Sequence, residues 1–91
     1  MLPIGVAGTN RHGQSFMVSA KATNLNHHGG TIAIPQSLKI GAVLTIRNAQ
    51  QTEASARVVK ELKSYAGTYT YGVEFVSDVA AFWGISFPSA N

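Results

Sequence analysis

The sequence predicts an all-β fold, either a barrel or a sandwich, built from about six short strands. Apolar and polar residues alternate with a period of two over several segments, which is typical of half-buried strands. Turn-forming Gly, Pro, Asn and Ser residues recur at intervals of roughly ten residues, the spacing of small all-β domains. The 91 residues, of which 45% are apolar and 12% charged, predict a single compact domain over residues 1–91.

The N-terminal segment is predicted to form a β-hairpin. Residues 2–9 are short, apolar and interrupted by glycine, as in a strand with a weakened middle. A turn at residues 10–13 supplies Asn and Gly for left-handed backbone positions. Strict alternation follows over residues 16–23, where one face carries Phe16, Val18, Ala20 and Ala22.

The polar turn Asn24–Gly30, with the sequence NLNHHGG, is the first candidate functional segment. It concentrates hydrogen-bonding side chains and conformationally permissive residues between two predicted strands. The strand after it covers residues 31–34 and ends at Pro35, and residues 35–41 are predicted to be a connection.

Two further strands are predicted in the middle of the chain. Residues 42–47 place Leu44 and Ile46 inward, and a polar loop follows at residues 48–51. Residues 53–65 have helical propensity, but their β-branched centre favours a strand. Simple alternation along this strand places one set of side chains on the same face, namely Ala54, Ala56, Val58, Lys60 and Leu62.

The C-terminal part begins with the clearest strand pattern of the chain, in residues 69–76. Ser77 or Asp78 is placed to cap a short helix, Val79 to Trp83, which Gly84 closes. Residues 85–88 are predicted to form an extended tail that packs on the barrel.

The charge pattern indicates a plain polar surface. The net charge is +3, and the only basic cluster, Arg57, Lys60 and Lys63, is interrupted by Glu61. We interpret this cluster as a solvated strand face, because nucleic-acid binding usually shows a denser basic stripe with aromatic residues. No apolar run approaches the length of about 20 residues that a membrane span needs. With no cysteine and no secretory signal, the expected location is cytoplasmic and no membrane partner is expected.

The sequence offers little for catalysis, metal binding or phosphate-binding glycine loops. The four carboxylates show no paired spacing, there is no thiol, and no Ser, His and Asp order stands out. His27 and His28 are adjacent and His12 lies on another turn, which is not the spacing of a metal site. Tyr69 and Tyr71 could stack on bases, but their spacing fits core packing at least as well. We expect a protein that is not an enzyme and holds no metal or cofactor.

The order of these segments resembles the PilZ domain, a family found in bacterial cyclic di-GMP signalling. The resemblance covers nearly the whole chain. It rests on a hairpin followed by N-x-N-x-x-G-G and an apolar strand. It also rests on Gly72-Val73-Glu74-Phe75, which is similar to the family's G-V-x-F strand. The segments 8–13 and 82–88 are similar to a divergent PilZ-like branch. The resemblance implies a six-stranded antiparallel β-barrel with a short C-terminal helix.

The resemblance also implies which residues would bind the ligand. The family's motif D/N-x-S-x-x-G is matched by Asn24 and Gly29, while Asn26 stands in place of the serine. The family's second motif, R-x-x-x-R, precedes the first strand and clamps phosphates and guanine edges. The chain does not carry it, and Arg11, in the first hairpin turn, is the only early arginine. The candidate ligand-binding residues are therefore Asn24, Asn26, Gly29 and Arg11.

We therefore expect a non-enzymatic module of bacterial cyclic di-GMP signalling or motility that acts through contacts with a protein partner of unknown identity. Cyclic di-GMP binding is expected to be weak or lost, because a dianionic dinucleotide needs forked cationic partners. Two alternatives remain open at this point. One is a functional cyclic di-GMP receptor with an altered site around Asn24–Gly30. The other is a small nucleic-acid-binding barrel that uses Arg57, Lys60, Lys63 and the tyrosines.

Overall fold

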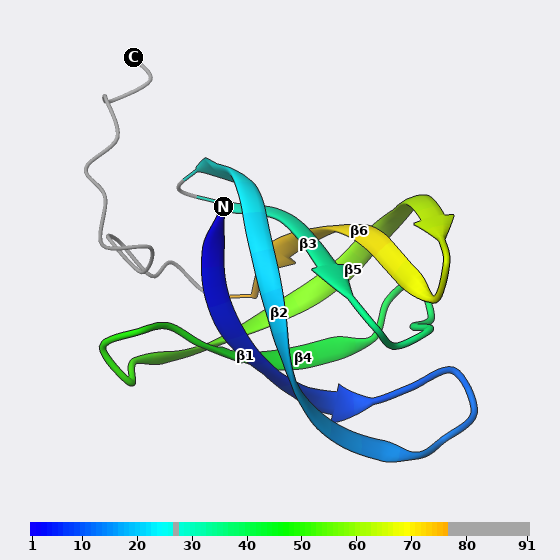
Figure 1. The fold of residues 1–91 in the computed structure, drawn as a ribbon. Coiled ribbons are helices and arrows are strands. Elements are labelled where there is room, and N and C mark those ends of the chain that lie inside the picture. The colour runs from blue at the N-terminus through cyan, green and yellow to red at the C-terminus, as the bar shows by residue number, and fades with distance from the viewer. Residues whose placement is uncertain (27, 77–91) are drawn as a thin grey trace.

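The computed structural model is a closed six-stranded antiparallel β-barrel, described over residues 1–26 and 28–76 (Figure 1). The strand order round the barrel is β1-β2-β3-β6-β5-β4, and β4 returns to pair with β1. The strands are β1 Leu2–Thr9, β2 Ser15–Asn26, β3 Gly29–Ile34, β4 Val43–Arg47, β5 Glu53–Tyr65 and β6 Thr68–Phe75. The prediction of an all-β fold, a six-stranded antiparallel β-barrel, is confirmed. The predicted helix, Val79 to Trp83, and the tail after it lie outside the described residues.

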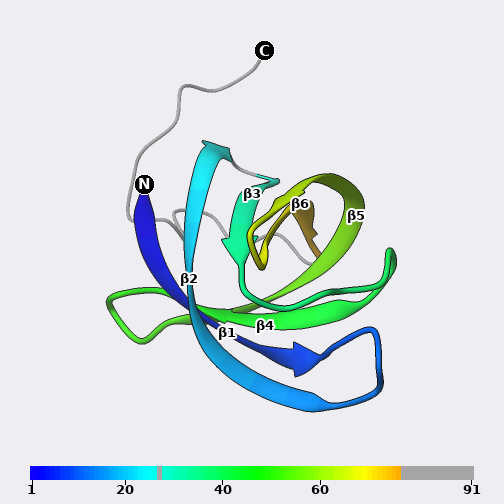
Figure 2. The same ribbon diagram turned by 45° about the vertical axis from the view of Figure 1, so that its right-hand side comes forward.

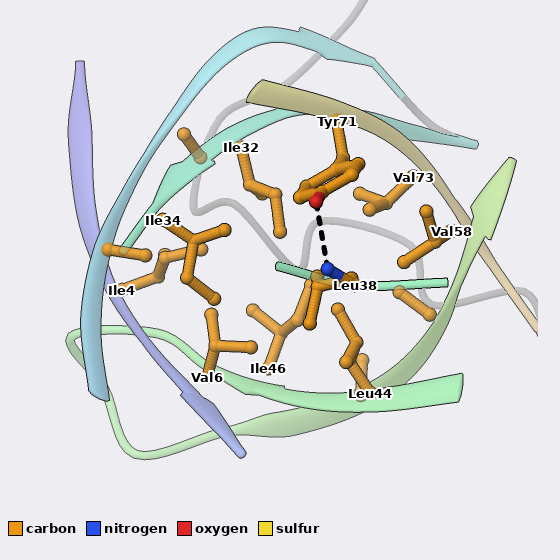
Figure 3. Close-up of a cluster of buried hydrophobic side chains, with 14 of the residues drawn as sticks. Ile4, Val6, Ile32, Ile34, Leu38, Leu44, Ile46, Val58, Tyr71 and Val73 are labelled. Carbon is orange, nitrogen blue, oxygen red and sulfur yellow. Dashed lines mark hydrogen bonds between the residues drawn. The ribbon is translucent and has the colours of Figure 1, made fainter. Parts of the chain in front are cut away.

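Each strand has one face toward the barrel interior, because side chains on a strand alternate between its two faces. The fully buried residues come from all six strands and from Leu38, which lies in the connection between β3 and β4 (Figure 3). The predicted inward positions Leu44 and Ile46 are confirmed. The core consists of Ile4, Val6, Ala20, Ala22, Ile32, Ile34, Leu38, Leu44, Ile46, Ala54, Ala56, Val58, Tyr71, Val73 and Phe75.

Leu38 brings the β3–β4 connection into the interior. Its backbone amide donates a hydrogen bond of 2.8 Å to the phenolic oxygen of Tyr71 (Figure 3). Tyr71 is fully buried, so this bond satisfies both its polar tip and a buried amide. The prediction that Tyr71 is a core residue is thus correct, and the ring of Tyr71 is stacked with that of Tyr69 at 6.4 Å.

The strand β5 differs from the predicted pattern. Simple alternation placed Lys60 and Leu62 on the same face as Ala54, Ala56 and Val58. Those three residues are buried, but Lys60 and Leu62 are exposed. The cause is two irregularities in the pairing of β5 with β6, one between Val58 and Lys60 and one between Glu61 and Lys63. An extra residue in one strand of a pair turns the residues after it to the opposite face.

The boundaries of the polar turn also differ from the prediction. The strand β2 continues to Asn26 and β3 begins at Gly29, so that the turn is shorter than the predicted 24–30 segment. The pairing of β2 with β3 shifts between Thr23 and Asn26. The turn lies at the same end of the barrel as the N-terminus, and the loop between β1 and β2 lies at the opposite end (Figures 1 and 2).

Candidate functional site

Asn26 holds the turn between β2 and β3 together. Its side-chain oxygen accepts hydrogen bonds from the backbone amides of His28 and Gly29, at 2.8 and 3.0 Å. A short polar side chain that bonds amides two and three residues later stabilises a tight turn. The side-chain oxygen of Asn26 therefore has two backbone partners within its own turn.

Asn24 adopts a left-handed backbone conformation, with φ of 50°. Asparagine tolerates this conformation better than most residues, because its side chain can form local hydrogen bonds. Its amide nitrogen lies 3.3 Å from the hydroxyl oxygen of Thr31 on β3. Asn24 is exposed at the irregularity in β2, where its side chain links the two strands.

Gly29 is buried at the start of β3, directly against β6. A Cβ atom there would overlap the carbonyl oxygen of Val73 and lie 2.9 Å from the Cα of Glu74. The adjacent carbonyl of His28 accepts a 2.6 Å hydrogen bond from the amide of Phe75. Glycine is required at this position for strand packing, whatever the surface outside it binds.

A groove of about 300 Å³ opens beside this turn. It brings together three of the four predicted site residues, Asn24, Asn26 and Gly29. Its other lining residues include Lys60 and Glu74, one charge of each sign, and sequence reasoning did not include them. The full lining consists of Asn24, Asn26, His28, Gly29, Gly30, Thr31, Val59, Lys60, Gly72, Val73 and Glu74. The signal that could have found Lys60 is the glycine opposite it on β6, Gly72, whose missing side chain leaves room for the lysine stem.

Arg11 lies away from this groove, at the opposite end of the barrel. Its guanidinium donates hydrogen bonds to the hydroxyl of Ser37, at 3.0 Å, and to the carbonyl of Leu38, at 2.8 Å. It also lies 3.8 Å from a carboxylate oxygen of Glu61 in an exposed ion pair. Arg11 thus fastens the β1–β2 loop to the β3–β4 connection, and the structure does not bring it to the other predicted site residues.

A second groove, of about 320 Å³, runs along the outer side of β1. Gly5 and Ala7 form its floor, Met17 borders it on β2, and an Arg47–Glu53 ion pair borders it on β4 and β5. The small residues Gly5 and Ala7, at alternate positions of β1, are the sequence signal that could have predicted this groove.

Within residues 1–26 and 28–76, no three His, Asp or Glu side chains gather where they could hold a metal ion. In the same part of the chain, no helix is long and apolar enough to cross a membrane.

Comparison of the chain with protein-family models, with curated proteins and with solved structures found no match.

Proposed function

We propose that this protein is a non-enzymatic PilZ-like module of bacterial signalling or motility that acts through protein contacts, with cyclic di-GMP binding weak or lost. The observation that carries the proposal is the role of Asn26, whose side-chain oxygen bonds two amides of its own turn. The segment that resembles the family's ligand-binding turn thus stabilises the connection between β2 and β3.

The electrostatics of the groove support the same proposal. A dianionic ligand is best held by guanidinium groups, each of which can form two parallel hydrogen bonds to phosphate. Among the described residues that line the groove, Lys60 is the only lysine or arginine, and Glu74 lines it as well. Since each charged hydrogen bond contributes about 1.5–3 kcal/mol, a groove whose described lining carries no arginine is expected to bind cyclic di-GMP several decades more weakly than a groove with two arginines.

Titration calorimetry of the chain with cyclic di-GMP tests this proposal. We expect no binding at micromolar concentrations, and we expect Asn24→Ala to leave that result unchanged. Micromolar or tighter binding that Asn24→Ala abolishes would contradict the proposal. That result would establish the alternative below.

The alternative is a functional cyclic di-GMP receptor with an altered site. It is favoured by one observation, namely that Asn24, Asn26 and Gly29 line one groove together with a cation. In this reading the exposed Asn24 would contact the ligand and Lys60 would contact its phosphate. Lys60→Ala should then weaken binding, while Arg11→Ala, at the opposite end of the barrel, should not.

A further inference from the structure

The pairing of β5 with β6 departs twice from regular register. The partners shift once between Val58 and Lys60 and again between Glu61 and Lys63. Each shift inserts one extra residue into β5, and each insertion reverses the face on which the following residues lie. The spacing of residues that share a face is therefore three along this part of β5.

The two shifts place three cations in one row. Arg57 lies opposite Glu74, Lys60 opposite Gly72 and Lys63 opposite Thr70. These partners on β6 are two residues apart, so they share a face, and it is the outer face because Tyr71 and Val73 between them are buried. Neighbouring cations in this row, which we call the cation row (Arg57, Lys60 and Lys63), are about 7 Å apart along the strand.

Apolar side chains interrupt the cation row. Val59 and Leu62, the residues at the two shifts, are 41% and 45% exposed, and Tyr65 beyond them is 79% exposed. A Cβ atom on Gly72 would lie 3.2 Å from the stem of Lys60 and 3.8 Å from the Val59 side chain. Both side chains therefore cover the same glycine on the outer face, and the row combines charge with exposed apolar surface.

The positive charge of the row is only partly balanced. The ion pairs between described residues are Arg11–Glu61 and Arg47–Glu53, and neither includes a residue of the row. Glu74 is the one acidic residue directly across from it, beside Arg57. Lys60 and Lys63 face Gly72 and Thr70, so their end of the row would attract a negatively charged partner.

We propose that the outer face of the β5–β6 hairpin, around the cation row, is a docking surface for an acidic polypeptide segment that also carries apolar residues. Carboxylates spaced along such a segment would meet Lys60 and Lys63, and its apolar side chains would cover Val59 and Leu62. The proposal rests on the proposed function, in which this domain acts through protein contacts, and it names the surface and the chemistry of the partner.

A polypeptide fits this face better than a single-stranded nucleic acid does. Bases bind such surfaces by stacking on aromatic rings, whereas the residues between the cations are aliphatic. Lysines and irregular pairing on a strand also oppose the addition of a further strand through the backbone. The side chains of the hairpin, and not its backbone edge, should therefore form the contact.

Fluorescence anisotropy with a labelled short peptide, in which Glu alternates with Leu and Ser, tests the proposal on the full chain. We expect saturable binding that the double variant Lys60→Glu, Lys63→Glu weakens by at least about tenfold. The pair Lys60→Arg, Lys63→Arg should retain binding within a factor of about three, because it keeps both charges. Lys21→Glu is the matched control, since Lys21 is exposed on β2, three strands from β5 in either direction round the barrel.

Four outcomes would overturn the proposal. The first is that the peptide shows no saturable binding, and the second is that a polyglutamate peptide without leucine binds with the same affinity as the test peptide. The third is that Lys21→Glu loses as much peptide affinity as the variant with both Lys60→Glu and Lys63→Glu. The fourth is that oligothymidylate or phosphatidylglycerol vesicles bind more tightly than the peptide. Circular dichroism and thermal melting of each variant show that a loss does not come from unfolding. Failure here is distinct from failure of the proposed function, which only cyclic di-GMP binding would contradict.

Discussion

At the scale of single residues, Gly29 shows how one position serves both the fold and the candidate site. It lines the groove beside the polar turn, but the space for a side chain is occupied by the backbone of β6. The sequence alone indicated a glycine-closed turn and the right neighbours for it. It could not show the contact with Val73 and Glu74, because that contact joins segments more than forty residues apart.

Gly29→Ala should lower the free energy of unfolding by about 3 kcal/mol or more, since the strands β3 and β6 must separate to admit the methyl group. Gly13→Ala is the control. Gly13 has a positive φ of 80° but open space around its Cβ position, so that only the backbone conformation costs about 1–2 kcal/mol. Urea denaturation measures both values, and equal losses in the two variants would refute the steric explanation.

The four predicted site residues differ in how well the sequence could place them. Asn24, Asn26 and Gly29 could be assigned to one place from the sequence, because they lie within six residues of each other. Arg11 could not be placed, because its position depends on which loops meet at the end of the barrel. The structure directs its guanidinium to Ser37 and Leu38, where it fastens two loops.

At the scale of elements, regular alternation predicted most strands well and failed on the longest one. The strand over residues 53–65 was predicted with its correct bounds, yet the faces after Val58 were wrong. Extra residues in a strand leave no mark in a hydrophobic pattern when the residues concerned are exposed. Arg57, Lys60 and Lys63 are three residues apart in the sequence, so they form a single row on the strand only because of those irregularities.

The β3–β4 connection is an element that the sequence could only describe as a linker. Leu38 makes it part of the core, because its side chain is fully buried and its amide reaches Tyr71. This contact ties the connection to β6 across the interior (Figure 3).

Tyr71→Phe should destabilise the protein by about 1–3 kcal/mol, because the amide of Leu38 would remain buried without a partner. Tyr69→Phe, on the same face of β6 but half-buried, should change stability by less than about 0.5 kcal/mol. Chemical denaturation of the two variants checks this. A neutral Tyr71→Phe would show that the connection is held by the packing of Leu38 alone.

At the scale of the whole molecule, alternation and turn spacing predicted an all-β domain without deciding between a barrel and a sandwich. The six-stranded antiparallel barrel was implied by the resemblance alone, and the structure confirms this architecture. The decision depends on whether the first and last members of the strand order pair with each other. Here β1 and β4 pair through only three residues on each strand, Gly5 to Ala7 with Thr45 to Arg47. Neither composition nor alternation can predict that two strands pair through so few residues.

Hydrogen exchange should reveal unequal stability round the barrel. The amides that pair β3 with β6, where six residue pairs lie next to the core, should exchange most slowly. The amides that pair β1 with β4 should exchange sooner, and the exposed end of the β5–β6 hairpin, residues 60–68, sooner still. Mass spectrometry of peptic fragments can order these segments, and uniform protection would contradict the expectation.

The short β1–β4 ladder has a consequence for how copies of this chain meet one another. If it opens, β1 and β4 each expose a strand edge that already matches the other in sequence and direction. The β1 edge of one molecule would then fit the β4 edge of a second as well as its own, which is the condition for an exchanged dimer or an open chain of subunits. Within one molecule, pairing of β1 with β4 is favoured because the effective concentration of one edge near the other is high. A high concentration of the protein reduces this preference over pairing between two molecules.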